Sequence, residues 1–256
     1  MAVGNAVFHL KRSRVISRLF VLAVLCALVC GPAWAEVSDE KMASHIATLL
    51  GGKFTPESLE VTVNQSCAYA EMRGVVLSGI RIDTMRLDAL LTNDNGALGS
   101  DVDSLASLIG YSKGEIVLLE RDVNNYFANN NTKGFSNLVF NFTPKGFRAD
   151  GIFSADFLFT LRVRLAAEGV LGLRSEGLYL EDVSIYVEKI KQPSALTNQI
   201  VNRVNPLLKW SDIPFKVEFR TVTIDDEATR MTGGPERLES GFKVLWPGEN
   251  QTEELP

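Results

Sequence analysis

The sequence predicts an α+β fold in which a long, curled antiparallel β-sheet wraps around, or packs on, a C-terminal amphipathic helix, with short additional helices. Three observations lead to this prediction. Residues 153–167 are apolar at every second position, several shorter segments alternate around hairpin turns, and residues 194–208 carry apolar side chains at helical spacing. Hairpins in place of regular strand–helix alternation exclude a doubly wound parallel sheet.

The first 35 residues have the organisation of a secretory signal peptide. Four Lys/Arg residues precede a short apolar run at 19–29, and Ala33-Trp34-Ala35 places small residues on either side of a large one. The apolar run is shorter than the about 20 residues that a membrane span needs. We therefore expect export to the periplasm or the medium with cleavage after Ala35, and an uncleaved N-terminal anchor is the alternative.

The charge of the chain limits its partners. The net charge is −5, and removal of residues 1–35, which hold four Lys/Arg and no Asp/Glu, changes it to −9. An acidic chain is poorly suited to nucleic acid, and it gains little from long-range attraction to anionic lipid headgroups. A membrane role must therefore rest on apolar contact or on local charge.

The rest of the chain predicts one domain over residues 36–233 and a Gly/Pro/Glu-rich tail over residues 234–256. The tail contains one isolated apolar segment, "FKVLW", at 242–246. Docking of this segment on the domain as an edge strand is favoured over contact with a membrane or a partner.

Apolar residues recur at helical spacing in four places. The first helix, around 42–50, is expected to close at Gly51-Gly52, and two short helices are expected around 102–109 and 119–127. The fourth begins at Ser194, a suitable N-cap, and Pro206 ends or bends it. Its apolar face consists of Leu196, Ile200, Val204, Leu207 and Leu208.

Strand patterns fill most of the remaining chain. Pro144-Lys145-Gly146 predicts a hairpin turn between two alternating segments. The longest alternating segment, 153–167, would be on the order of 50 Å long as a single strand. In segments 80–87, 178–185 and 217–224, apolar residues occupy positions 1, 3, 6 and 8. The alternation of apolar and polar residues therefore shifts by one residue in the middle of each segment. A β-bulge in each would keep the apolar side chains on one face, and three unrelated strand crossings explain the spacing equally well.

Little in the sequence indicates catalysis. His45 is the single histidine and Cys67 the single cysteine after residue 35, so a Cys/His metal site cannot be assembled and no intramolecular disulfide is expected. Motifs of serine hydrolases, P-loop enzymes and zinc proteases are absent. We therefore expect a binding protein and not an enzyme, with no cofactor and no metal.

Two segments resemble a known family. "EIVLLERDVNNYF" is similar to a segment in which a strand runs into Leu-Thr/Glu-x-x-Asp-Leu-Asn-x-Tyr, and "NRVNPLLKWSDIPFKVEFRTVTIDD" is similar to that family's closing motif. With the strands between them, residues 38–233 resemble the LmeA-like phospholipid-binding proteins of bacterial envelopes, which are allied to the tubular lipid-binding superfamily. The acidic charge and the tail after Gly233 depart from the pattern. The resemblance implies a curled sheet around a helix, with an apolar groove that binds phospholipid.

The long alternating segment and the resemblance lead to the same candidate site. A groove along 153–167 would remove acyl chains from water, at about 0.8 kcal/mol per buried CH₂. A plain packed core of sheet against helix is the alternative. Arg162 and Arg164 would point to the opposite face. The expected lipid-binding residues are Phe153, Phe157, Phe159, Leu161, Val163 and Leu165, with Ile80, Ile82, Leu178 and Leu180 from neighbouring strands and Leu196, Ile200 and Val204 from the helix.

The expected function is that of an exported phospholipid-binding protein, with lipid carriage in the cell envelope as one role. Its expected partner is phospholipid, with transient membrane contact and without nucleic acid. Two alternatives stay open. One is a non-catalytic structural or adaptor protein of the envelope with a dry core, and the other is a hydrolase without a recognisable motif.

Overall fold

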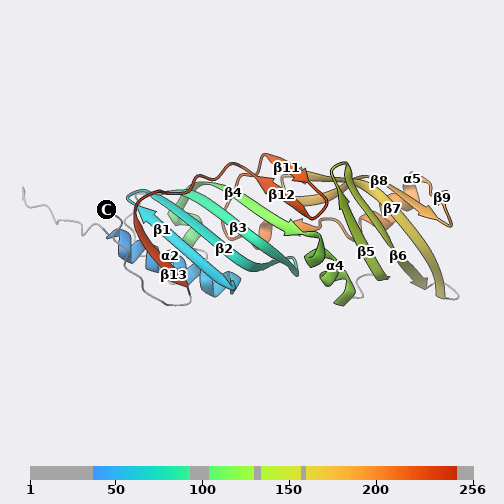
Figure 1. Ribbon diagram of the computed structural model, residues 1–256, viewed down its shortest axis with the longest axis horizontal. Coiled ribbons are helices and arrows are strands. Elements are labelled where there is room, and N and C mark those ends of the chain that lie inside the picture. Colours follow the sequence, from blue (N-terminus) through green and yellow to red (C-terminus); the bar gives the residue numbers. More distant parts are fainter. Residues whose placement is uncertain (1–36, 93–103, 130–133, 157–159, 247–256) are drawn as a thin grey trace, which may run out of the picture. The chain divides into compact units, whose positions relative to one another are not determined.

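A computed structural model describes residues 37–92, 104–129, 134–156 and 160–246 (Figure 1). These residues form an α+β fold dominated by antiparallel sheet, as the alternating segments predict. Residues 1–35, the expected signal peptide, lie outside the described residues. Within the part of the chain that the structure describes, no helix is long and apolar enough to cross a membrane.

The first sheet, sheet A, has seven strands in the order β11-β12-β4-β3-β2-β1-β13, and its ladders are antiparallel. Four consecutive strands form its centre, and strands from the C-terminal part of the chain add to both edges (Figure 1). The strands are β1 (Ser58–Asn64), β2 (Cys67–Leu77), β3 (Ile80–Leu91), β4 (Ile109–Leu119), β11 (Thr221–Ile224), β12 (Ala228–Thr232) and β13 (Phe242–Trp246).

The second sheet, sheet B, has the order β10-β8-β7-β6-β5, and β9 pairs with β8. Its ladders are also antiparallel, and β5 and β6 meet at the turn Pro144-Lys145, which confirms the predicted hairpin. The strands are β5 (Phe135–Thr143), β6 (Gly146–Asp156), β7 (Thr160–Arg174), β8 (Gly177–Val187), β9 (Ile190–Lys191) and β10 (Leu208–Lys209).

Helix α2 (Asp39–Phe54) covers one face of sheet A, where it contacts β1 and β13. The Ser38 side chain caps it by accepting a hydrogen bond from the Lys41 N–H at 3.4 Å. The predicted end at Gly51-Gly52 is wrong, because the helix continues to Phe54 and ends at Thr55, whose φ of 41° is left-handed. Both glycines are tolerated inside the helix because apolar packing outweighs their low helix propensity.

The two short helices expected around 102–109 and 119–127 are α3 (Ser104–Leu108) and α4 (Glu120–Asn129). Helix α4 joins the end of β4 to the edge strand β5 of sheet B. The Asn124 side chain donates to the Phe140 carbonyl at 2.9 Å and accepts from the Phe140 N–H at 2.7 Å. The Phe127 ring also contacts the Phe140 ring, with centroids 5.2 Å apart. Helix α4 thus covers the exposed edge of β5.

The prediction of one strand over 153–167 is wrong, because the chain reverses within it. Strands β6 and β7 form an antiparallel pair in which Phe153 lies opposite Val163 and Asp156 opposite Thr160. Phe153, Val163, Leu165 and Ala167 still share one face, because paired residues in an antiparallel ladder point to the same side. A strand of fifteen residues does exist, but it is β7, shifted toward the C-terminus.

The expected C-terminal helix is shorter than predicted and does not fill a curled sheet. Helix α5 (Ser194–Val201) has Pro193 as its N-cap, not Ser194, and it contacts β8 at one side of sheet B. Val204 lies beyond its end, and Leu208 lies in strand β10. Leu207 and Leu208 pair their backbone with Leu178, so extended pairing replaces the helix at these residues.

The three segments whose alternation shifts in the middle (80–87, 178–185 and 217–224) do not share one structural feature. The β7–β8 ladder shifts register between Glu168 and Val170, and Asp182 has a φ of 50°, so β8 contains an irregularity where it was expected. The β2–β3 ladder keeps its register across Asp83 and Thr84. Strand β11 begins only at Thr221. The common spacing therefore has different causes.

The apolar tail segment docks as predicted. Strand β13 (Phe242–Trp246) pairs with β1 and forms one edge of sheet A. The Trp246 ring lies close to helix α2, where a side chain added at Gly51 would come within 2.7 Å of it. The tail from 234 to 246 thus contributes to the folded domain, and residues 247–256 lie outside the described residues.

Candidate functional site

An open hollow of about 530 Å³ is the candidate site. It lies where the first residues of β4, the last residues of β7 and the segment 210–219 meet. Most of its walls are apolar or aromatic side chains. They are Ile109, Gly110, Tyr111, Ser112, Leu173, Arg174, Ser175, Trp210, Ile213, Phe215, Lys216, Val217, Glu218 and Phe219.

One wall is held by backbone pairing to β4. The Glu218 N–H donates to the Ser112 carbonyl at 2.9 Å, and the Gly114 N–H donates to the Glu218 carbonyl at 3.1 Å. Gly114 allows this approach because a Cβ there would lie only 2.5 Å from the Val217 Cγ1 and 2.8 Å from the Phe219 ring. The absence of a side chain at Gly114 thus positions Val217 and Phe219.

Trp210 forms a second wall. It lies in the short 3₁₀ helix η1 (Trp210–Asp212), and its ring packs on Phe219 with centroids 4.7 Å apart. The indole N–H donates to the Arg174 carbonyl at 3.0 Å, so its polar atom is satisfied while the ring lines the hollow. The Asp212 carboxylate accepts from the Ser78 N–H at 2.8 Å and hydroxyl at 2.7 Å, which fastens η1 to the β2–β3 turn.

A cluster of hydrogen-bonded polar side chains centred on Glu218 lies at the rim of the hollow. The Glu218 carboxylate accepts hydrogen bonds from the Arg220 Nε–H at 2.8 Å and from the Tyr111 hydroxyl. The Arg220 hydrogen bond, followed by that from Tyr111, lowers the pKa of Glu218 to about 2. Glu218 is therefore ionised at neutral pH and is occupied by its own neighbours. Lys216, also on the rim, is exposed and has no ion-pair partner among the described residues.

These features suit an apolar ligand with one polar end. Ile109, Leu173, Trp210 and Phe219 are only partly buried, so water contacts apolar surface that a ligand could cover. The volume lies within the range of about 300–1,000 Å³ that small-molecule sites occupy. Among the described residues, no group of His, Cys, Asp and Glu side chains is arranged to hold a metal ion.

The residues predicted to line a groove lie elsewhere. Strand β3 belongs to sheet A and strands β7 and β8 to sheet B, so the strands expected to be neighbours are in different sheets. Phe157 and Phe159, and the side chain of Leu161, lie outside the description. The others comprise the buried Ile80, Ile82, Leu165, Leu178, Leu180 and Ile200, the partly buried Phe153, Val163 and Val204, and the exposed Leu196.

None of the predicted residues whose side chains are described lines the hollow. The signal that sequence reasoning missed lies in "WSDIPFKVEF", at 210–219, where Ile213, Phe215, Val217 and Phe219 alternate with polar residues. In the sequence, this segment indicated only the family resemblance and not a binding site. Its alternation indicates a one-sided apolar strip, although the partners of that strip come from distant parts of the chain.

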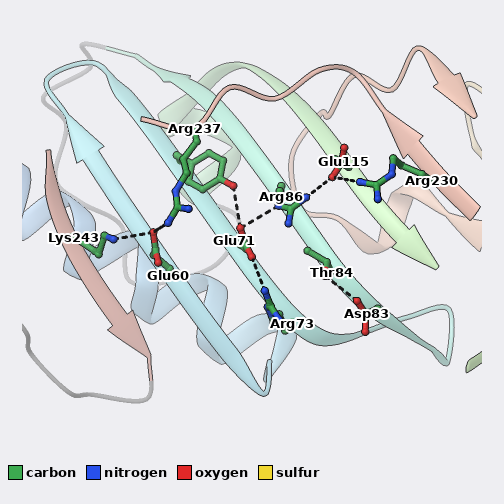
Figure 2. A network of polar contacts seen from close by, with 11 residues as sticks. Glu60, Glu71, Arg73, Asp83, Thr84, Arg86, Glu115, Arg230, Arg237 and Lys243 are labelled. Atoms are coloured by element: carbon green, nitrogen blue, oxygen red, sulfur yellow. Dashed lines mark hydrogen bonds and ion pairs between the residues drawn. The ribbon is translucent and has the colours of Figure 1, made fainter. Parts of the chain in front are cut away.

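Ion pairs cross the face of sheet A that lies opposite to α2, and we call this row the charged row (Figure 2). Arg86 joins Glu71 on β2 at 3.1 Å to Glu115 on β4 at 2.6 Å. Glu115 also binds Arg230 at 2.8 Å, and Glu71 also binds Arg73 at 3.3 Å. At the other edge, Glu60 binds Arg237 at 2.7 Å and Lys243 at 3.2 Å.

The charged row ties strands together and leaves no carboxylate of the row unpaired. Burial by itself would raise the pKa of Glu71, but hydrogen bonds from Arg86 and Arg73 outweigh it and the pKa is lowered. Burial, with the nearby Glu71 charge, raises the pKa of Tyr69 to about 12. Glu71 is therefore ionised and Tyr69 neutral at neutral pH, and the ion pairs of the row link neighbouring strands of the sheet.

No family model, no curated protein and no solved structure matches this chain.

Proposed function

We propose that this chain is an exported phospholipid-binding protein that holds an acyl chain in the hollow beside Trp210. Export would remove residues 1–35 after Ala35, as the basic start, the short apolar run and Ala33-Trp34-Ala35 suggest. The observation that carries the proposal is a hollow of about 530 Å³ with partly exposed aromatic and aliphatic walls. The resemblance of the sequence to the LmeA-like family supports the same ligand class.

The chemistry of the hollow agrees with such a ligand. Each CH₂ that moves from water onto the Trp210–Phe219 wall contributes about 0.8 kcal/mol. On the rim, Lys216 supplies a positive charge without an ion-pair partner in the described part of the chain, which suits a phosphate group. Glu218 is already bound to Arg220 and Tyr111, so it does not repel that phosphate as a free carboxylate would.

The test is lipid uptake by a protein whose hollow has been filled. In Ile109→Trp a larger ring would occupy the space, and Ile224→Trp is the matched control, since Ile224 is also partly buried on sheet A but does not line the hollow. Loss of contact with two CH₂ groups costs about 1.6 kcal/mol, or slightly more than tenfold in affinity. Uptake of labelled phospholipid from vesicles should fall by at least about that factor in Ile109→Trp alone.

Mass spectrometry of the gently purified wild-type protein complements the uptake assay. Co-purified phospholipid is expected. Repeated extraction without lipid, together with no uptake from vesicles, would contradict the proposal and favour the adaptor alternative. Release of lipid hydrolysis products would favour the hydrolase.

A further inference from the structure

The hollow beside Trp210 has space for a limited number of carbon atoms. A cavity of about 150 Å³ holds one benzene molecule, which corresponds to about 25 Å³ for each carbon atom. By this measure, a volume of about 530 Å³ holds about twenty carbon atoms. Bilayer-forming phospholipids carry two chains of about 16 carbon atoms each, which matches the roughly 30 Å hydrocarbon core of a membrane. The hollow therefore has space for one such chain and not for two.

The walls of the hollow are fixed in place, so the hollow cannot easily widen. The segment that carries Phe219 is joined to β4 by backbone hydrogen bonds, and its ring lies 2.8 Å from the position that a Cβ of Gly114 would occupy. The Trp210 N–H donates to the Glu176 carbonyl at 3.0 Å, and its indole N–H donates to the Arg174 carbonyl at 3.0 Å. A second acyl chain would have to break some of these hydrogen bonds to enter.

Two other hollows on the described surface do not provide space for a second chain. One has a volume of about 190 Å³ beside Lys209 and Asp212, which corresponds to only seven or eight carbon atoms at about 25 Å³ each. The other, on sheet B, is lined by charged side chains of both signs, among them Arg148, Asp150 and Glu168. Neither suits the remainder of an acyl chain.

The rim of the hollow beside Trp210 offers one free charge to the polar end of a ligand. Arg174 is paired with Glu181 at 2.6 Å, and Glu218 is paired with Arg220 at 2.8 Å. Lys216 has no ion-pair partner among the described residues. The rim therefore suits a ligand with a single anionic group.

We propose that the hollow selects lipids with one acyl chain and an anionic head, a class that comprises lysophospholipids and fatty acids. The proposal rests on the function proposed above and narrows its ligand. The second chain of a diacyl phospholipid would stay in water when the complex leaves a membrane. Each CH₂ group left in water weakens the complex about fourfold, so a whole exposed chain outweighs the contacts of the head.

The experiment is competitive loading of the wild-type exported protein from vesicles. The vesicles contain equal amounts of phosphatidylglycerol and lysophosphatidylglycerol, both with chains of about 16 carbon atoms. The protein is separated from the vesicles, and its bound lipids are extracted and quantified by mass spectrometry. In a second set of vesicles, a fatty acid of the same length replaces lysophosphatidylglycerol, which distinguishes the two sources of a single chain.

The single-chain lipids should exceed phosphatidylglycerol in the extract by at least about tenfold, because only their chain is covered completely. Equal or preferred loading of phosphatidylglycerol would overturn this inference and leave the proposed function in place. Loading of the fatty acid without lysophosphatidylglycerol would support the single-chain class and contradict the proposed phospholipid ligand. Absence of all three lipids would contradict both proposals.

A series of chain lengths tests the capacity of the hollow. Affinity for lysophosphatidylglycerols, in steps of two from about 10 to about 22 carbon atoms, should rise up to about 18 and change little beyond. In Ile109→Trp, whose added ring displaces about two CH₂ groups, the rise should end about two carbon atoms earlier. Leu173→Phe tests the same point on another wall, and Ile224→Trp is the control without a change. A rise that continues to the longest chain in the wild type would overturn the inference.

The head of the ligand is tested at Lys216. Lys216→Glu should weaken binding of both single-chain lipids at least several-fold, because it replaces the free cation of the rim by a carboxylate. Lys209→Glu is the matched control, since Lys209 is also exposed but does not line the hollow, and its affinity should stay near that of the wild type. Equal losses in the two variants would overturn the assignment of an anionic head to this rim.

Discussion

Arginines on sheet A and on sheet B have similar positions in their strands but different surroundings. On sheet A, Arg86 lies opposite Glu71 on one neighbouring strand and Glu115 on the other. On sheet B, Arg162 and Arg164 lie opposite Ser154 and Ile152, which offer no carboxylate. Cross-strand neighbours therefore decide whether a strand arginine ties the sheet together or stays available to a ligand.

The contrast concerns how the two outer faces use their charged side chains. A carboxylate shared by two or three cations, as in the charged row, has no capacity left for a partner. Within the described residues, Arg162 and Arg164 make no ion pair, so they do not join strands of sheet B as Arg86 joins strands of sheet A. We therefore regard the outer face of sheet A as tied together by ion pairs, whereas Arg162 and Arg164 form no such cross-strand tie among the described residues of sheet B.

The largest expected effect concerns the inner faces of the two sheets, which carry the buried apolar side chains. The experiment tests whether these faces also differ. Ile82 in sheet A and Leu178 in sheet B are both 0% exposed. If both belong to packed core, Ile82→Ala and Leu178→Ala should each lower the free energy of unfolding by about 2–5 kcal/mol. Denaturant unfolding of the lipid-free proteins measures this. A large loss in Ile82→Ala with little loss in Leu178→Ala would mean that Leu178 faces an open groove, as the sequence suggested for both residues, and that Ile82 does not.

A smaller effect is expected from the arginines themselves. Arg86→Met removes hydrogen bonds to two partly buried carboxylates, and we expect a loss of about 1–2 kcal/mol in the free energy of unfolding. Arg164→Met removes no pairing in the described structure, so it should change stability by less than about 0.5 kcal/mol. Equal losses in the two variants would contradict the distinction between the outer faces.

The smallest expected effect is a loss of stability at acidic pH. The lowered pKa of Glu71 means that the folded state favours the ionised carboxylate more than the unfolded state does, whose pKa is near 4.5. The contribution of Glu71 to the free energy of unfolding is therefore complete above pH 4.5. It is lost as the pH falls from 4.5 toward the lower pKa of Glu71 in the folded state. Between about pH 5 and pH 3, the wild type should lose more stability than Glu71→Gln, as measured by urea unfolding. Parallel pH profiles would show that Glu71 contributes no such stability.

Local features of the fold could be predicted from the sequence. Pro144-Lys145 sets a hairpin, the spacing around 119–127 forms α4, and the apolar segment at 242–246 docks as an edge strand. Each depends on neighbouring residues in the chain. The hairpin within 153–167 was missed because odd-numbered residues share a face in both strands, and the connecting residues are Phe, Leu and Phe, without a turn-forming residue.

The site could not be predicted, because its walls come from three distant segments. Ile109, Leu173 and Trp210 meet only after both sheets have formed. Gly114, which admits Phe219, carries no local sign that a ring will lie 2.8 Å from its Cβ position. That Arg162 and Arg164 have no ion pair within the described residues likewise depends on the register of β6 and β7, which alternation alone does not specify.

Quenching of tryptophan fluorescence tests the central claim most directly. The chain has three tryptophans, so Trp34→Phe with Trp246→Phe leaves Trp210 in the hollow, and Trp34→Phe with Trp210→Phe leaves Trp246 beside α2. Both proteins are loaded with a phospholipid that carries bromine on its acyl chains, and bound lipid is quantified by extraction. We expect strong quenching of Trp210 and little quenching of Trp246 at equal lipid content. Equal quenching of both, or no quenching of Trp210 in protein that contains lipid, would contradict the assignment of the hollow as the acyl-chain site.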